Sequence, residues 1–238
     1  MTIVHTLASR IATSHTTASP PFLVAICGWA DTGKSTLAHE VCNALASMGT
    51  SADWISTDAF MNDRAERNRL GISGYNPLSI DVAALSDTVR RFVARENVTY
   101  HPYDNRTGTK SPVQKTIRPQ SVIVVEGIHA FHPSIASAHH LRVFIDADEP
   151  TLRAMRLRAN IDKRGMDPTQ AAKRIDAELE DYRRYIVPMK SRADVSVTVS
   201  CDFDYAIKND GVGNLIATRL HDASALLGSL DARSRDFH

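Results

Sequence analysis

Uninterrupted apolar runs recur along the chain and predict buried β-strands. The first covers residues 22–27 and directly follows Pro20 and Pro21, and its length and flanking prolines favour a strand over a helix. Residues 121–127 and 141–145 form further largely apolar runs, residues 52–56 and 193–199 also predict strands, and a shorter β-prone run lies at 205–207. Strands that are apolar throughout are typical of a parallel sheet covered by helices on both faces. The pattern therefore predicts a doubly wound α/β fold.

Segments with apolar residues at helical spacing separate these runs. They cover residues 36–45, 82–94, 151–163, 169–186 and 215–227. Gly49 ends the first segment, and Asp81 is placed to cap the N-terminus of the second. Leu7 and Ile11 predict a short helix near the N-terminus, and the polar run at 13–19 predicts a connector between that helix and the first strand.

Length and composition favour a single domain. The chain has 238 residues, of which 43% are hydrophobic, and this supports one sizeable core. We expect an N-terminal extension over residues 1–21 and a tail over 231–238, which frays as termini commonly do. Between them we expect one domain over residues 22–230, with a lid at about 151–185.

The net charge argues against nucleic-acid and membrane partners, and the cysteine content indicates the state of the thiols. The 28 basic and 27 acidic residues leave a net charge of +1, so no overall field attracts nucleic acid or an anionic membrane. No stretch approaches the roughly 20 apolar residues of a membrane span, and the first 19 residues lack the apolar run of a secretory signal. Three scattered cysteines indicate reduced core thiols. We expect a cytoplasmic protein with a small-molecule partner and leave homo-oligomer formation open.

Residues 28–35, with the sequence GWADTGKS, directly follow the first predicted strand. They match the pattern G-x-x-x-x-G-K-[ST] of a phosphate-binding P-loop, with the required strand and helix on either side. Its glycines let backbone N–H groups converge on phosphate oxygens at a helix N-terminus. Lys34 is placed to reach the β- and γ-phosphates, and Ser35 to bind Mg²⁺. The residues expected to hold ATP are Gly28, Ala30, Asp31, Thr32, Gly33, Lys34, Ser35 and Thr36.

Two carboxylates follow predicted strands at the edge where parallel sheets bind ligands. Glu126 ends the run at 121–127 and is the candidate metal ligand beside Ser35, although a solvated or helix-capping carboxylate is the alternative. Asp58 lies shortly after the run at 52–56, where it could deprotonate an acceptor hydroxyl or hold the water molecules of the metal. Its alternative role is to cap a helix that begins at Ala59.

A basic segment begins at about residue 151. It contains Arg153, Arg156, Arg158, Lys163 and Arg164, and guanidinium groups along one side of a helix suit phosphate contact. Because it lies between two predicted helices, it predicts a mobile lid that excludes water from the transferred group. A solvated helix face is the alternative.

Three further segments carry polar groups. Residues 61–79 form a polar stretch with Arg64, Arg67 and Arg69, and their length predicts a functional loop with one helical turn. Residues 98–103 and 115–118 predict a hairpin around the turn at 104–110. The cluster of His129, His132, His139 and His140 matches no metal-ligand spacing, so we expect ordinary loop or surface histidines.

Taken together, several segments resemble the uridine kinase and phosphoribulokinase superfamily of P-loop kinases. They are residues 28–36, 58–60, 75–81, 102–104, 126–128 and 156–164, in an order and spacing that agree from about residue 22 to 199. The resemblance implies a five-stranded, mainly parallel core. It also implies transfer of the γ-phosphate of ATP to a hydroxyl of a small metabolite.

The resemblance also implies roles for individual residues. Asp58 becomes the catalytic carboxylate and Glu126 a metal-site carboxylate, whereas Lys34 is a catalytic candidate from the P-loop motif itself. Arg156 and Arg164 become lid cations that act in catalysis. Asp81 and Tyr103 match positions that line the acceptor pocket, and Arg106, in the neighbouring turn, is a further candidate for that pocket.

The chain departs from uridine kinases at two positions that bear on the acceptor. Gly108 stands where these enzymes typically carry a histidine, and Met166 where they carry an arginine. The resemblance itself implies a nucleoside or sugar-like acceptor, whereas the two departures indicate a carboxylate- or phosphate-bearing acceptor of the glycerate, pantothenate or phosphosugar type as the alternative. The second would use Arg64, Arg67, Arg69 and Arg106. A non-catalytic nucleotide-binding regulatory protein is the third, because an intact P-loop can persist without transfer chemistry.

Overall fold

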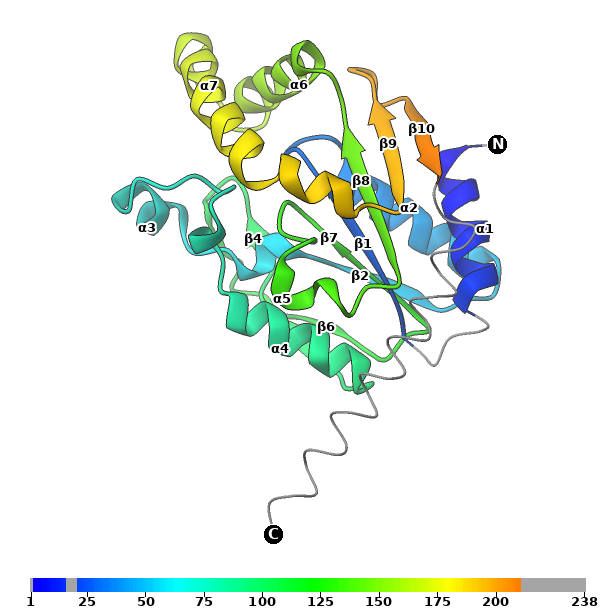
Figure 1. Cartoon of the computed structure of the whole chain (residues 1–238). Helices are drawn as coiled ribbons and strands as arrows, with labels where there is room; N and C mark the ends of the chain where they lie inside the picture. Colours follow the sequence, from blue (N-terminus) through cyan, green and yellow to red (C-terminus); the bar gives the residue numbers. More distant parts are fainter. Residues whose placement is uncertain (1, 16–20, 211–238) are drawn as a thin grey trace.

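A six-stranded sheet forms the centre of the computed structural model, which describes residues 2–15 and 21–210 (Figure 1). Its strands, in spatial order, are β10 (Tyr205–Asp210), β9 (Val195–Val199), β8 (Leu141–Asp146), β1 (Phe22–Gly28), β7 (Val122–Glu126) and β2 (Ala52–Ser56). The five strands from β9 to β2 are parallel, and β10 pairs antiparallel with β9 at the edge. The predicted doubly wound, mainly parallel sheet is therefore confirmed.

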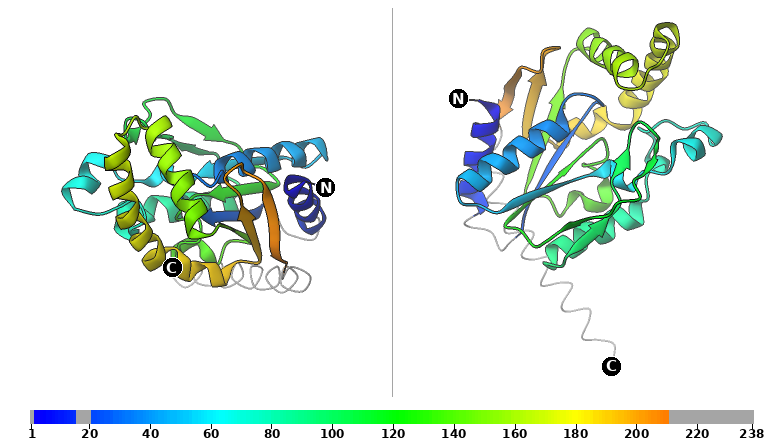
Figure 2. Two further views of the ribbon diagram at one scale, coloured as in Figure 1. Left: turned by 90° about the horizontal axis from the view of Figure 1, so that it is seen from above. Right: turned by 180° about the vertical axis from the view of Figure 1, so that it is seen from behind.

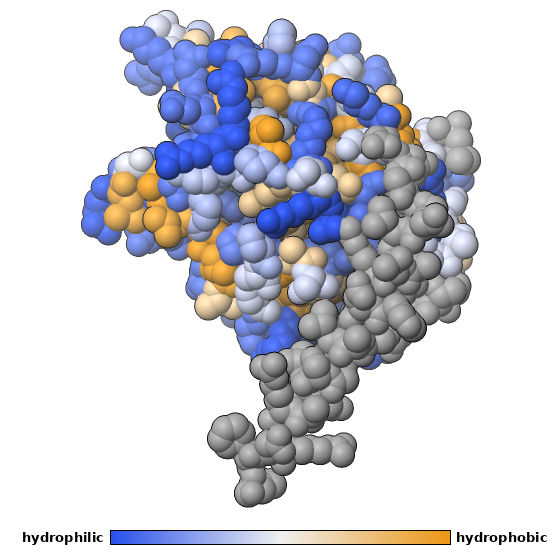
Figure 3. All heavy atoms as spheres, viewed as in Figure 1, coloured by the Kyte–Doolittle hydropathy of each residue, from blue (hydrophilic) through white to orange (hydrophobic). Residues whose placement is uncertain are grey.

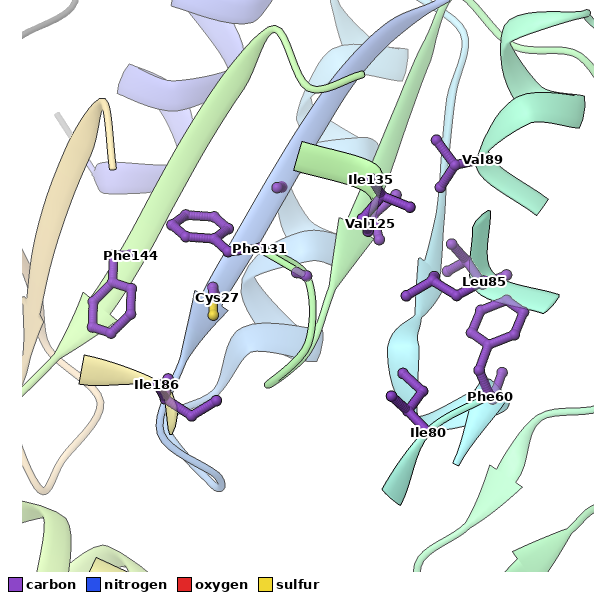
Figure 4. Close-up of a cluster of buried hydrophobic side chains, with 14 of the residues drawn as sticks. Cys27, Phe60, Ile80, Leu85, Val89, Val125, Phe131, Ile135, Phe144 and Ile186 are labelled. Atoms are coloured by element: carbon purple, nitrogen blue, oxygen red, sulfur yellow. The ribbon is translucent and has the colours of Figure 1, made fainter. Parts of the chain in front are cut away.

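Helices cover both faces of this sheet, as the uninterrupted apolar strands predict. On one face α1 (Ile3–His15) and α2 (Lys34–Ser47) pack against Val24 and Ile26 of β1, and the two helices lie side by side in both views of Figure 2. On the other face lie α4 (Val82–Val93), α5 (Pro133–Ala136) and α7 (Pro168–Tyr185). Figure 4 shows Ile135 of α5 beside Val125 of β7, with residues of α4 directed toward them.

The predicted lid consists of two helices at the carboxyl ends of the parallel strands. Helix α6 (Glu149–Asp162) is followed by α7 and by the 3₁₀ segment η3 (Val187–Arg192). Asp148 caps α6 by accepting a hydrogen bond from Thr151 N, and Asp167 caps α7 in the same way. Hydrophilic side chains cover the outer ends of α6 and α7, whereas hydrophobic ones lie near α3 (Figure 3).

The polar stretch at 61–79 is more ordered than a loop with a single helical turn. It contains α3 (Arg64–Arg69) and the 3₁₀ segment η2 (Pro77–Ser79), and it follows a further 3₁₀ segment, η1 (Thr57–Phe60). The predicted hairpin instead forms two short ribbons, in which β3 (Val98–Tyr100) pairs with β6 (Lys115–Ile117) and β4 (Tyr103–Asp104) with β5 (Thr109–Lys110). Pro102 lies between the ribbons, where its missing N–H cannot continue a ladder.

The four clustered histidines lie in loops, as expected, but three of them are buried instead of exposed. His129, His139 and His140 are each less than a tenth exposed. His140 Nδ1 accepts a hydrogen bond from Leu23 N at 3.0 Å, and His129 Nε2 lies 2.9 Å from Gly74 O. Burial lowers the pKa of His129 to about 4 and that of His139 to about 3, which keeps both rings neutral. His129, His139 and His140 are therefore packed inside the protein.

Some predicted segments fall outside the described residues. These are most of the connector at 13–19, the helix at 215–227 and the tail at 231–238. In the part of the chain that the structure describes, no helix is long and apolar enough to cross a membrane.

Candidate active site

The register of three strands brings the predicted site residues to one edge of the sheet. Ile26 of β1 and Ser56 of β2 are both paired with Glu126 at the end of β7. The P-loop follows β1 directly, and Asp58 follows β2 within η1. The phosphate cradle and both carboxylates therefore meet at the carboxyl edge, where open parallel sheets bind ligands.

The P-loop connects β1 to α2 and depends on its two glycines. Gly28 has a φ of +148°, and a Cβ atom there would lie 2.1 Å from Ile145 O of the neighbouring strand. Gly33 has a φ of +78° and is the N-cap residue of α2, where it has no side chain of its own to cap the helix. Lys34 Nζ donates a hydrogen bond of 2.5 Å to Trp29 O across the loop. The amino group therefore lies against the backbone of the P-loop.

Ser35 and Glu126 form the candidate metal site. Ser35 Oγ donates a hydrogen bond of 2.9 Å to Glu126 Oε1, and Glu126 is almost completely buried. Burial raises the pKa of Glu126 to about 7; the nearby charge of Lys34 opposes this shift, whereas that of Asp58 adds to it. Mg²⁺ is usually held by one or two carboxylates, waters and substrate phosphates. A hydroxyl and one buried carboxylate beside a phosphate cradle fit that ion. In the described residues, no group of three or more His, Cys, Asp and Glu side chains could hold a metal.

Asp58 lies inside η1, and its carboxylate lines the cleft next to the P-loop. It does not cap a helix, because Ser56 does so by accepting a hydrogen bond from Asp58 N at 3.3 Å. Asn105 Nδ2 donates to Asp58 Oδ2 at 3.3 Å from the turn between β4 and β5. The amide of Asn105 thereby orients one side of the carboxylate.

Both predicted lid arginines reach the P-loop through Asp31. Arg156 Nη1 lies 2.5 Å and Arg164 Nη1 3.3 Å from Asp31 Oδ2. Arg156 also makes two hydrogen bonds of 2.7 Å to the two carboxylate oxygens of Glu178 on α7. Burial acts to raise the pKa of Asp31, but the charges of Arg156 and Arg164 outweigh it and the pKa is lowered. The lid cations therefore lie beside the phosphate cradle, paired with carboxylates.

The cleft has a volume of about 250 Å³ and extends from the P-loop to α3. On the α3 side it is lined by Met61, Arg64, Arg67, Gly74, Tyr75 and Asn105. Arg67 is only 8% exposed, and its guanidinium group donates to Tyr103 Oη at 2.7 Å and to Asn62 O at 3.1 Å. Arg64 donates to the carbonyl oxygens of Asn105 and Arg106. Among the described residues, neither guanidinium group has a carboxylate partner.

The three predicted acceptor residues do not line this cleft. Asp81 caps α4, because its Oδ1 accepts a hydrogen bond from Ala84 N at 2.9 Å. Tyr103 lies behind Arg67 and donates to Gly108 O at 2.9 Å. The side chain of Arg106 is 85% exposed and lies 3.7 Å from Asp104. A direct role in acceptor binding stays a prediction for each of them.

Several residues that line or support the site were not predicted. Trp29 lies in the P-loop but is fully buried, 4.9 Å from the ring centroid of Tyr75 and 4.7 Å from that of Tyr182. Glu178, which holds Arg156, was also missed. The only signal in the sequence was its spacing from Arg174, which donates to it one helical turn away.

Residues 23–206 match the Phosphoribulokinase / Uridine kinase family. The chain belongs to this family. A uridine kinase of Leuconostoc citreum is 24% identical over 182 residues, which are 74% of this chain and 87% of that protein. The resemblance inferred from the motifs is thus confirmed. Membership makes the protein a phosphotransferase of the P-loop kinase type, with a small-molecule substrate, ATP as the implied nucleotide and typically Mg²⁺.

Solved structures of kinases share the fold. D-glycerate 3-kinase from Cryptococcus neoformans var. grubii superimposes with a TM-score of 0.66 at 15% identity, over 88% of this chain and 98% of that chain. Phosphoribulokinase from Rhodobacter spheroides superimposes with a TM-score of 0.61 at 19% identity, over 74% of this chain and 69% of that chain. These likenesses confirm the P-loop kinase fold.

Proposed function

We propose that this family member transfers the γ-phosphate of ATP to a hydroxyl group of a small molecule bound between the P-loop and α3. One observation carries the proposal. A single cleft is lined by the P-loop lysine, the Ser35–Glu126 pair, Asp58 and the lid arginines. Phosphoryl transfer needs a phosphate cradle, a metal site, a group that orients the acceptor and cations that neutralise charge. The residues in this cleft could supply all four.

Each residue then has a distinct task. Lys34 and the N–H groups of the P-loop bind the β- and γ-phosphates. Ser35 and Glu126 would hold Mg²⁺, which neutralises phosphate charge when it is bound. Arg156 and Arg164, which lie against the P-loop, would stabilise the developing charge of the transferred group.

Asp58 receives the proton of the acceptor. As the acceptor oxygen bonds to the γ-phosphorus, the bond from that phosphorus to the oxygen of ADP breaks, and the hydroxyl proton passes to Asp58. The amide of Asn105 keeps the carboxylate directed into the cleft. Asp58 returns the proton to solvent after the product leaves.

An assay of ADP release with a panel of acceptors tests this proposal. The panel contains nucleosides, neutral sugars, hydroxy acids and sugar phosphates, each measured with ATP and Mg²⁺. ADP release that depends on one class of acceptor would support transfer. Acceptor-independent hydrolysis, or no turnover with any compound, would instead favour the nucleotide-binding regulatory protein.

A specific observation favours an acceptor that carries a carboxylate or phosphate. The guanidinium group of Arg67 is buried at the cleft and has no carboxylate partner in the part of the chain that the structure describes, and burying an unpaired charge is costly. Burial, together with the like charges of Arg67, Arg174 and Arg164, lowers the pKa of Arg64, although Tyr103 opposes this shift. An anion on the acceptor would relieve both conditions.

The substitution Arg67→Met tests this candidate, with Arg69→Met as the matched control. Arg69 is exposed on the same helix and does not line the cleft. We expect Arg67→Met to raise the KM for an anionic acceptor about tenfold or more, with the KM for ATP unchanged in both variants. An equal KM in the two variants would reject an anion site at Arg67.

A further inference from the structure

Asp31 places an acidic side chain inside the phosphate-binding loop. Its φ is +62°, in the left-handed region that glycine adopts freely and that other residues adopt at a cost, Asp and Asn among the least affected. The P-loop pattern accepts any residue at this position, so the motif itself does not require an acid. A strained conformation at a ligand site indicates that the side chain has a task there.

Three cations of the lid surround the Asp31 carboxylate. Arg156 Nη1 lies 2.5 Å and Arg164 Nη1 3.3 Å from Oδ2, and Lys163 Nζ lies 3.8 Å from Oδ1. Burial acts to raise the pKa of Asp31, but the charges of Arg156 and Arg164 lower it below its usual value, so the carboxylate is charged at neutral pH. All four side chains line the same cleft as Lys34. A phosphate in this cleft and Asp31 would therefore compete for the same cations.

The two arginines depend on Asp31 to different degrees. Arg156 is also held by both carboxylate oxygens of Glu178, at 2.7 Å each. Arg164 makes a further hydrogen bond of 3.2 Å to the neutral Asn160 Oδ1, and within residues 2–15 and 21–210 Asp31 is the carboxylate with which it pairs. An anion that displaced Asp31 would thus gain Arg164, whereas Arg156 would stay with Glu178.

We propose that the Asp31 carboxylate is a built-in competitor of the nucleotide phosphates for Arg164. In the free protein it occupies the guanidinium group, and a triphosphate displaces it because several charges attract the cation more strongly than one. The displacement costs affinity for every phosphate ligand, and the cost is hardest to meet for an anion of low charge. This inference rests on the proposed function, because it takes the triphosphate to lie in the P-loop.

Calorimetric titration of ATP and of inorganic tripolyphosphate, each with Mg²⁺, tests the inference. The substitution Asp31→Asn removes the charge but keeps a side chain that tolerates the left-handed conformation. We expect it to tighten tripolyphosphate and ATP about tenfold or more, because a charge-assisted hydrogen bond no longer has to be broken. Asp31→Gly also suits this φ and removes the carboxylate. It should give the same gain, and it decides the test if Asp31→Asn does not fold.

Two further variants separate competition from a general loss of charge. Asp176 also belongs to the lid, where it pairs with Arg153, but its side chain is 70% exposed and does not line the cleft. Asp176→Asn should therefore leave the affinity for tripolyphosphate within about twofold of the wild type. Arg164→Met removes the group for which Asp31 and phosphate compete. Adding Asp31→Asn to Arg164→Met should then change the affinity by about threefold or less.

Three results would overturn the inference. An affinity that is unchanged or weaker in Asp31→Asn would show that Asp31 does not oppose phosphate binding. An equal gain in Asp176→Asn would reduce the effect to net charge. An equal gain in the Arg164→Met background would mean that Asp31 repels phosphate without competing for this arginine. If neither the wild type nor Asp31→Asn binds ATP or tripolyphosphate, the proposed function itself is refuted.

Discussion

Replacing Glu178 by glutamine should strongly destabilise the protein, because it removes the charge that holds a buried guanidinium group. Arg156 donates two hydrogen bonds of 2.7 Å to Glu178, and the two side chains are 8% and 6% exposed. Removing one partner of a buried pair costs about 3 to 5 kcal/mol. At about 2 to 4 °C per kcal/mol for a chain of this size, the Tm should fall by roughly 6 to 20 °C.

The pH dependence of this loss follows from the pKa of Glu178. Burial acts to raise that pKa, but hydrogen bonds and charge from Arg156 outweigh it, so the pKa is lowered from 4.5. A lowered acid pKa contributes stability above the unfolded value, and this contribution disappears as the pH falls through the folded value. The difference between wild type and Glu178→Gln should therefore be largest near pH 7.5 and vanish in acid.

Denaturant unfolding at pH 7.5 measures the effect, with Glu149→Gln as the matched control. Glu149 also pairs with arginines of the lid, Arg153 and Arg183, but its side chain and those of both arginines are 42% or more exposed. Exposed pairs contribute little because solvent screens them. Equal losses of unfolding free energy in the two variants would refute the view that the buried pair holds the lid arginine in place.

Two further variants test the metal site and the buried histidines. Glu126→Gln should raise the Mg²⁺ concentration for half-maximal ADP release about tenfold or more, since it removes the only carboxylate proposed to bind the ion. Identical Mg²⁺ titration curves for this variant and the wild type would refute that role. Burial lowers the pKa of His139 from 6.5 to about 3. Below pH 6.5 the unfolded chain therefore binds a proton at this residue and the folded protein does not, so the free energy of unfolding falls. From pH 7.5 to pH 5 the wild type should lose about 2 kcal/mol more than His139→Leu, and parallel stability profiles would contradict this.

The strands of the sheet and the P-loop were predictable because each is indicated by a pattern within a short stretch of consecutive residues. Apolar runs such as 22–27 are typical of strands buried on both faces, as in a parallel sheet, and the motif from Gly28 to Ser35 lies directly between a strand and a helix. The positions of Asp58 and Glu126 follow from chain order as well, because Glu126 ends the parallel strand β7 and Asp58 follows the parallel strand β2. Their chemical roles stay predictions.

Contacts between side chains of different helices could not be predicted from the sequence in the same way. The charge run on α6 is equally typical of a solvated face, and only the packing of α7 places Glu178 against Arg156. Trp29 is likewise buried because Tyr75 and Tyr182 meet it from two other segments. The burial of Arg67, which favours an anionic acceptor, depends on how α3 folds against the β4–β5 ribbon.

The most direct test of the proposed transfer site is the Asp58→Asn substitution. The amide has the shape of the carboxylate but cannot receive the acceptor proton. With the acceptor found in the panel, the account predicts a fall in kcat of about 10²- to 10⁴-fold, with the ATP affinity from calorimetric titration within about twofold of the wild type. Retention of most of the transfer activity, or a parallel loss of ATP binding, would contradict the account.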